Sequence, residues 1–227
     1  MKMNNLVITI DGPAGSGKST IAKLLAEKLG VSYLDTGAMY RAITLTAMKA
    51  GFDLTDTEVM LAVISRNKFE FECKNDQMAA RVNGTDITDK IRLPEVTENV
   101  HFIASNPDLR EILVKMQQQF AHKQGRIVTE GRDQGTVAFP CADIKFFLTA
   151  DENERAKRRQ IQLNEAGIGK PHNEILEAIK ERDLKDTSRK VGALKPAGDA
   201  IIIDTTNFNI EQVVEKLLCE IQKKKLQ

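Results

Sequence analysis

Residues 12–20 have the residue types and the spacing of a phosphate-binding loop. They are Gly12, Pro13, Ala14, Gly15, Ser16, Gly17, Lys18, Ser19 and Thr20, and they match a glycine, four variable residues and then Gly-Lys-Ser. Glycines let the backbone turn its N–H groups toward phosphate oxygens, and a following helix adds its positive N-terminal end. Lys18 would place a positive charge at the β- and γ-phosphates, and the Ser19 hydroxyl would reach Mg²⁺. The segment therefore predicts a nucleotide-binding loop with Lys18 in catalysis.

Arginines spread through the chain favour a small-molecule kinase among the proteins that use such a loop. A kinase must hold a second, phosphate-bearing substrate and neutralise the charge on the group in transfer. The candidates are Arg41, Arg110, Arg132, Arg182 and Arg189. A further basic cluster, Arg155, Lys157, Arg158 and Arg159, is by itself better explained as a solvated helix face paired with Glu152 and Glu154. The chain has no Asn-Lys-x-Asp segment of the kind that reads guanine in a GTPase.

Alternating strand and helix patterns predict the elements that position these residues. Residues 6–10 are a short β-branched run typical of a buried parallel strand, and apolar residues at helical spacing follow the loop up to Gly30. Residues 126–130, 144–148 and 200–204 predict further strands, each before a helical pattern, and Asn209 is expected to cap the last helix. This order predicts right-handed βαβ crossovers and a three-layer α/β fold with a mainly parallel sheet of five strands.

One region, about residues 66–93, departs from that alternation. Apolar and charged residues alternate from 68 to 73, and residues 81–87 predict a hairpin about a tight Asn83-Gly84 turn. We therefore expect a small antiparallel insert. Thr55 with Glu58 is expected to form a capping box for the helix before it, and helices are expected to begin at Pro94 and again at Asn106-Pro107. No linker composition separates this insert, so residues 1–227 are taken as a single domain.

Composition excludes several other classes of protein. The 227 residues carry 33 basic and 32 acidic side chains, a net charge of +1, whereas a broad nucleic-acid binder carries a basic excess. No stretch free of charged side chains exceeds nine residues, and the N-terminus lacks the apolar stretch of a signal peptide, so we expect no membrane partner. Cys73, Cys141 and Cys219 are widely spaced and fit idle thiols in a reducing cytoplasm.

Four stretches of the sequence resemble the bacterial cytidylate kinases, a family of nucleoside monophosphate kinases, and the likeness extends along essentially the whole chain. They are residues 10–20, the Tyr-Leu-Asp-Thr-Gly-Ala-Met-Tyr-Arg of 33–41, the Gly-Arg-Asp-Gln-Gly-Thr-Val of 131–137, and 180–183 with Asp186 and Arg189. The second and third are far more specific than the phosphate loop. The resemblance implies ATP-dependent, Mg²⁺-assisted phosphorylation of CMP and dCMP by a cytoplasmic monomer. It also implies a monophosphate-binding region over residues 36–105 and a lid over 151–170.

The resemblance also implies a role for each matching residue. Arg41, Arg132 and Arg189 would hold the phosphate of the acceptor, for which guanidinium groups are well suited. Arg110 and Asp133 would read cytosine, the carboxylate accepting from the 4-amino group and the guanidinium donating to the O2/N3 edge. Uracil reverses both polar positions and would leave buried groups unpaired. Arg182 and Asp186 would lie near the sugar, Asp35 and Thr36 in the acceptor site, and Arg155, Arg158 and Arg159 in the lid over the ATP phosphates.

Three positions depart from what is usual in the family. His101 stands where a serine near the base is usual, Glu130 ends a strand that more often ends in aspartate, and Gln134 replaces an apolar residue. His101 has two interpretations. It is either an inert, half-exposed helix residue, or it replaces the serine, in which case a neutral imidazole would accept a hydrogen bond from the cytosine 4-amino group.

Two rival functions stay open beside this one. One is another small-molecule kinase, acting on UMP or shikimate, and both the pair Arg110 and Asp133 and the Gly-Arg-Asp string of 131–133 argue against it. The other is a nucleotide-switched binding protein, which would bind ATP or GTP tightly and turn over slowly. Because the acceptor of a monophosphate kinase is already an oxyanion, no catalytic base is expected. Lys18, Mg²⁺ and the lid arginines are expected to carry most of the catalysis.

Overall fold

Five parallel strands form the central sheet of the computed structural model, which describes residues 5–74, 77–165 and 167–225. The strands are, in spatial order, β2 (Ser32–Asp35), β6 (Arg126–Gly131), β1 (Leu6–Asp11), β7 (Ile144–Thr149) and β8 (Ile201–Asp204). The predicted five-stranded parallel sheet is confirmed, as are the four strands that were delimited from the sequence. The fifth, β2, was not delimited because Ser-Tyr-Leu-Asp contains no apolar run.

The register of the sheet brings three carboxyl side chains to one edge. Asp11 ends β1 opposite Gly131, and Asp35 ends β2 opposite Glu130 of β6. Parallel strands place all their carboxyl ends on the same side of a sheet, which is where α/β proteins bind ligands. The phosphate loop, residues 12–20, leaves β1 at this same edge.

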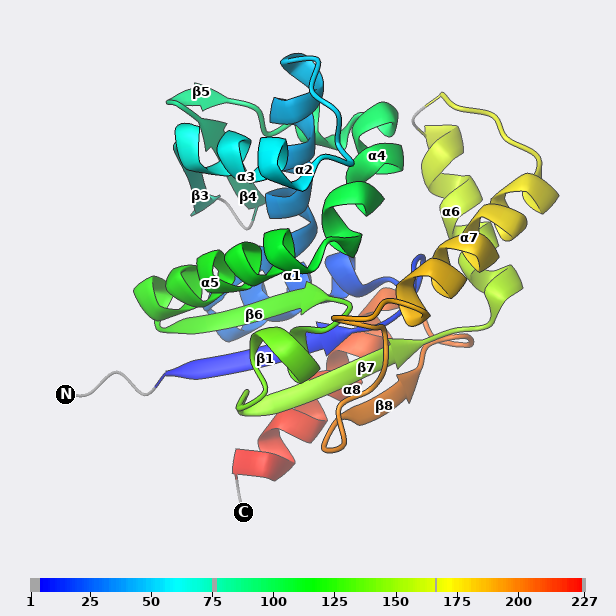
Figure 1. Cartoon of the computed structure of the whole chain (residues 1–227). Helices are drawn as coiled ribbons and strands as arrows, with labels where there is room; N and C mark the ends of the chain where they lie inside the picture. Colours follow the sequence, from blue (N-terminus) through cyan, green and yellow to red (C-terminus); the bar gives the residue numbers. More distant parts are fainter. Residues whose placement is uncertain (1–4, 75–76, 166, 226–227) are drawn as a thin grey trace.

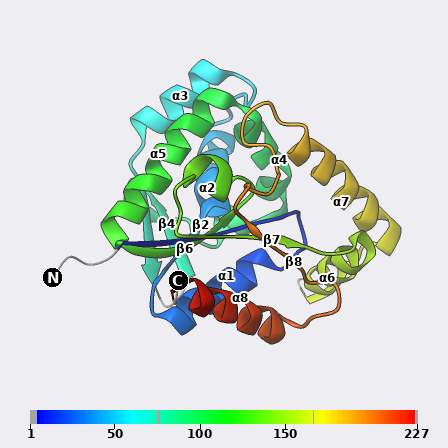
Figure 2. The ribbon, with the colours of Figure 1, turned by 90° about the horizontal axis from the view of Figure 1, so that it is seen from below.

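Helices cover both faces of the sheet and complete the predicted three layers (Figure 2). α1 (Lys18–Leu29) and α8 (Ile210–Lys225) lie on one face. The opposite face carries α2 (Thr36–Lys49), α3 (Thr57–Arg66), α4 (Pro94–Ser105) and α5 (Pro107–Gln124). β1 serves both cores through its period of two: Ile8 and Ile10 pack with α1 and α8, and Val7 packs toward the other face. α6 (Glu152–Glu165) and α7 (His172–Thr187) pack on each other beyond the carboxyl end of β7 (Figure 1).

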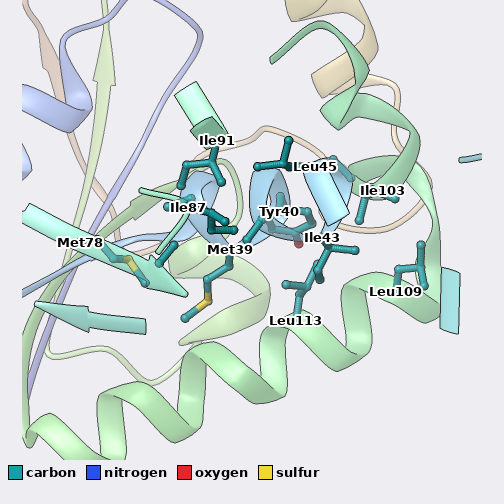
Figure 3. Close-up of a cluster of buried hydrophobic side chains, with 14 of the residues drawn as sticks. Met39, Tyr40, Ile43, Leu45, Met78, Ile87, Ile91, Ile103, Leu109 and Leu113 are labelled. Carbon is teal, nitrogen blue, oxygen red and sulfur yellow. The ribbon is translucent and has the colours of Figure 1, made fainter. Parts of the chain in front are cut away.

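The predicted antiparallel insert is present on the face that α2 covers. It consists of β3 (Phe69–Lys74), β4 (Gln77–Val82) and β5 (Thr85–Asp86). Asn83 and Gly84 both have positive φ, 50° and 79°, as a two-residue type I′ turn requires. Met78 and Ile87 of the insert pack beside Met39 of α2 (Figure 3). The insert is thereby anchored to α2.

Helix caps confirm two predictions and correct one. Asn209 and Gln212 bond reciprocally at the start of α8, and the Asn106 side chain accepts from the first turn of α5. The capping box of Thr55 with Glu58 is wrong. Asp56 caps α3 by accepting from the Val59 N–H at 3.1 Å. The Thr55 hydroxyl instead donates to Asp53, because the chain enters α3 through a turn closed by that carboxylate. No helix in the described part of the chain is long and apolar enough to cross a membrane.

Candidate active site

The phosphate loop wraps tightly over the carboxyl edge of the sheet. A Cβ at Gly12 would lie 2.1 Å from the Leu148 carbonyl oxygen, so only glycine fits where the loop leaves β1. Lys18 is buried, and its Nζ donates to the Pro13 carbonyl at 2.8 Å across the loop. Ser19 and Thr20 are exposed at the start of α1. The loop is therefore compact, with the Lys18 side chain folded back across it.

Burial and neighbouring positive charge make the Lys18 ammonium easy to deprotonate. Removal from water and then the charge of Arg132 lower its pKa to about 7, against the opposing effect of Glu130. An anion bound in the loop would favour the charged form and raise this pKa again. Lys18 is thus poised to gain a proton when phosphate binds.

Nucleotide binding at pH 8 is therefore expected to be accompanied by the uptake of at most about one proton per site. The uptake should be much smaller at pH 6, where Lys18 is already charged. Isothermal titration of MgATP in buffers of different ionisation enthalpy measures this uptake. Lys18→Arg is the matched control, because arginine stays charged and should show no uptake from this position. Equal uptake by the two proteins would assign the proton to another group.

Glu130 is a member of the site that the sequence showed only as a departure from the family pattern. Its buried carboxylate accepts from the Ser19 hydroxyl at 2.8 Å and from the Tyr33 hydroxyl at 3.4 Å. Burial, followed by the charges of Glu130 and Asp35, raises the pKa of Tyr33. Glu130 is the penultimate residue of β6, the strand next to β1, and its side chain reaches Ser19 at the end of the loop. A carboxyl residue at the end of a neighbouring strand was the available signal.

Asp35 and Thr36, which the resemblance assigns to the acceptor site, lie where β2 passes into α2. The Asp35 carboxylate caps α2 by accepting from the Ala38 N–H at 2.9 Å, and it pairs with Arg41 at 3.1 Å. It also lies 3.5 Å from Arg92, an exposed arginine of the insert that sequence reasoning missed. The Thr36 hydroxyl donates to the Glu130 carbonyl at 2.7 Å and so ties α2 to β6.

Asp186 pairs with two further arginines that the resemblance assigns to the acceptor site. Arg132 donates to it at 2.6 Å, and Arg189 pairs with its second oxygen. Burial opposes the charged form, but Arg132 and Arg189 hold the pKa of Asp186 below its usual value. Arg182 is exposed at this cluster, and partial removal from water together with the charge of Arg132 lowers its pKa to about 10. The structure thus brings Arg132, Arg182, Asp186 and Arg189 together.

Arg110 and Asp133, the two residues that the resemblance assigns to base recognition, form a buried ion pair, called the base-reading pair below. The Arg110 guanidinium also donates to the Ala104 carbonyl at 2.9 Å and lies 5.7 Å from the centre of the Tyr40 ring. The backbone at Gly192, with φ 67°, covers the pair. A Cβ there would lie 2.1 Å from Arg110 Nη2 and 2.5 Å from Asp133 Oδ2. Glycine is required at that position by both conformation and space.

His101 lies half-buried on α4, one turn before Ala104. Its Nδ1 is 2.7 Å from the Glu98 carbonyl, and its ring lies 4.1 Å from the Phe102 ring. Since a carbonyl only accepts, Nδ1 carries the hydrogen, and in the neutral ring Nε2 is the acceptor.

The three arginines assigned to the lid have different environments. Arg155 is buried, donates to the Ala14 carbonyl of the phosphate loop at 3.1 Å and pairs with Asp183 of α7. Arg158 donates to the Thr205 carbonyl at 2.7 Å, beside β8. Arg159 is exposed and contacts only Gln162 of its own helix among its described hydrogen bonds. Arg155 is therefore held against the phosphate loop, whereas Arg159 is exposed to solvent.

Comparison with known proteins gives consistent matches along the chain. A family described as "Cytidylate kinase" matches residues 8–223. "Cytidylate kinase" of Clostridium botulinum (strain Langeland) is 46% identical over 98% of this chain and 100% of its own. The protein of the same description from Haemophilus ducreyi is 43% identical over 97% and 98%. Among solved structures, an uncharacterized protein from Eubacterium ventriosum is 15% identical, with a TM-score of 0.52 over 96% of this chain and 99% of that one, which shows a shared fold.

Proposed function

This chain belongs to the cytidylate kinase family, and from that membership we infer that it transfers the γ-phosphoryl group of ATP to CMP and dCMP. The observation that carries this inference is the placement of the base-reading pair. Arg110 and Asp133 are buried at the carboxyl edge that also bears the phosphate loop and the arginines about Asp186. Both substrates can therefore meet at one edge of the sheet.

The donor side fits ATP with Mg²⁺. Backbone N–H groups of the loop and the N-terminus of α1 would hold the phosphates, and Lys18 would place its charge on the β- and γ-phosphates. The Ser19 hydroxyl and the Glu130 carboxylate, 2.8 Å apart, are the hard oxygen ligands that Mg²⁺ prefers, either directly or through water. Bound there, Mg²⁺ would neutralise charge on the transferred group.

The acceptor side supplies positive charge and base recognition. Arg41, Arg132 and Arg189 would bind the CMP phosphate. To do so, they would replace some of their present ion-pair contacts with Asp35 and Asp186 by contacts with the phosphate. Arg182 and Asp186 would then contact the sugar. The acceptor oxygen needs no base, so these residues bind and orient it.

The base-reading pair would distinguish cytosine from uracil. Asp133 would accept from the 4-amino group, and Arg110 would donate to the O2/N3 edge. We include His101 in this base site because Ala104, one turn along α4, already contacts the Arg110 guanidinium. In the neutral ring Nε2 is the acceptor, and it would take the second hydrogen of the amino group.

We also propose that residues 36–105 close over the acceptor and that residues 151–170 act as the lid. Arg159 is the lid arginine that is exposed to reach ATP, while Arg155 joins the lid to the loop through Ala14. The near balance of charge, +1, supports a protein without a nucleic-acid partner. Uncrosslinked Cys73, Cys141 and Cys219 fit a reducing cytoplasm, where we propose that the chain acts as a monomer.

One assay tests the function against its rivals. ADP formation from MgATP is measured with CMP, dCMP, UMP, AMP, GMP and shikimate, and CMP and dCMP are expected to give the highest kcat/KM. Preference for UMP or shikimate would make the chain a different small-molecule kinase. Tight nucleotide binding without turnover on any acceptor would favour the nucleotide-switched protein.

Glu130→Gln is expected to raise the Mg²⁺ concentration needed for half-maximal activity by about 10-fold, because the variant keeps its shape and loses the carboxylate charge near the metal. The measurement is ADP formation against Mg²⁺ at fixed ATP. Tyr33→Phe is the matched control, since it removes one hydrogen-bond donor to Glu130 and leaves the carboxylate in place. An unchanged Mg²⁺ dependence in Glu130→Gln would remove Glu130 from the metal site.

A further inference from the structure

Asp11 is a buried carboxylate at the centre of the site, and none of the roles above uses it. It is the last residue of β1 and directly precedes the phosphate loop. Only 4% of it is exposed to solvent. Oδ1 accepts from the Gln134 N–H at 2.8 Å, and Oδ2 accepts from the Gly135 N–H at 2.7 Å. Both oxygens therefore bind consecutive backbone amides on the acceptor side.

These two amides open the turn that begins at Asp133. The turn is a single π-helical turn over Gln134–Ala138, in which the Phe139 N–H donates to the Gln134 carbonyl and three other N–H groups donate to the Asp133 carbonyl. That carbonyl accepts from the Val137 N–H at 2.8 Å and from the Ala138 N–H at 3.2 Å. The backbone next to Asp133 is thus held by the turn on one side and by Asp11 on the other. The backbone conformation limits which rotamers the Asp133 side chain can adopt.

The rest of the turn contacts β1, β6 and α5. The Gln134 side chain accepts from Thr129 at 2.9 Å and donates to Gln117 of α5 at 3.2 Å. A Cβ at Gly135 would lie 3.0 Å from the Thr9 hydroxyl, so the turn sits directly on β1. Carboxylate bonds to backbone amides are stronger than neutral ones, which makes Asp11 the principal charged anchor of the turn.

We propose that Asp11 is a positioning residue for base recognition, holding the turn that aims Asp133 at Arg110 and at the cytosine 4-amino group. This rests on the proposed function. β1 itself is held by backbone pairing with β6 and β7, so the phosphate loop keeps its place when the Asp11 side chain changes. The residue acts on the acceptor from the strand that carries the donor site.

Asp11→Asn tests the proposal, since the side-chain amide keeps the shape but turns an NH₂ group toward a backbone N–H. We expect kcat/KM for CMP to fall about 10- to 100-fold, mostly through KM, and the CMP-to-UMP preference to fall about 10-fold. The KM for MgATP should stay within about twofold of wild type. Asp11→Ala leaves a space that water can fill, and it is expected to show the same changes in the kinetics of CMP, UMP and MgATP.

Thr9→Val is the matched control. It changes a buried hydroxyl on the same strand that has no hydrogen-bond partner among the described residues, and it should retain the CMP-to-UMP preference. Equal losses for CMP and UMP, or a rise in the KM for MgATP, would overturn the proposal. Failure of both Asp11 variants to fold would also overturn it, because the carboxylate would then support the fold itself. Absence of a CMP preference in the wild type would instead refute the proposed function.

Discussion

Lys18→Ala is expected to lower kcat by about 100- to 1000-fold and to leave CMP binding to the nucleotide-free protein nearly unchanged. Lys18 lies inside the phosphate loop, where its Nζ contacts the Pro13 carbonyl. Its charge would act on the donor phosphates and stabilise the negative charge that is spread over the transferred group in the transition state. Arg132 and Arg182 both lower the pKa of Lys18, so the mutation also removes the repulsion between Lys18 and these two arginines.

Steady-state kinetics with MgATP and CMP, together with calorimetric CMP binding to the nucleotide-free variant, check this prediction. Lys18→Arg serves as the control that keeps the positive charge and changes its shape. A variant that turned over at the wild-type rate would remove the phosphate loop from the mechanism. A large loss of CMP affinity would show that Lys18 instead helps to form the acceptor site.

Asp133→Ala is expected to lower kcat/KM for CMP, with a loss of transition-state stabilisation of about 2–4 kcal/mol, and to affect UMP far less. Of the two bases, only cytosine carries an amino hydrogen that this carboxylate would accept. The structure adds a second consequence, because Asp133 is the buried ion-pair partner of Arg110. Removing it leaves an uncompensated guanidinium, and the free energy of unfolding should fall by about 3 kcal/mol.

The double variant Asp133→Ala/Arg110→Met separates these effects. It removes the unpaired charge and should recover much of the lost stability without recovering the preference for CMP. Chemical denaturation measures the stability, and kcat/KM for CMP and UMP measures the preference. Equal kinetic losses for both substrates in the single variant would make Asp133 structural, with Arg110 as the residue that it supports.

Features that depend on a few neighbouring residues could be predicted from the sequence. The phosphate loop, the Asn83-Gly84 turn and the cap at Asn209 each combine one backbone conformation with residue types that favour it. The buried strands are recognised by their apolar runs, as β1 and β7 show. The cap of α3 was placed on Thr55 and not on Asp56, because both are good capping residues and only the path of the chain selects one.

The sequence by itself therefore determined the family, the phosphate loop, the layered α/β plan and the residue types available at the site. Only the tertiary structure decided which of those residues face one another. Glu130 meets Ser19 across 111 positions of sequence, and Asp11 meets Gln134 across 123. Gly192 reaches the base-reading pair from yet another loop. Such contacts depend on strand register and on how loops pack at the sheet edge, and no local pattern of residues encodes those distances.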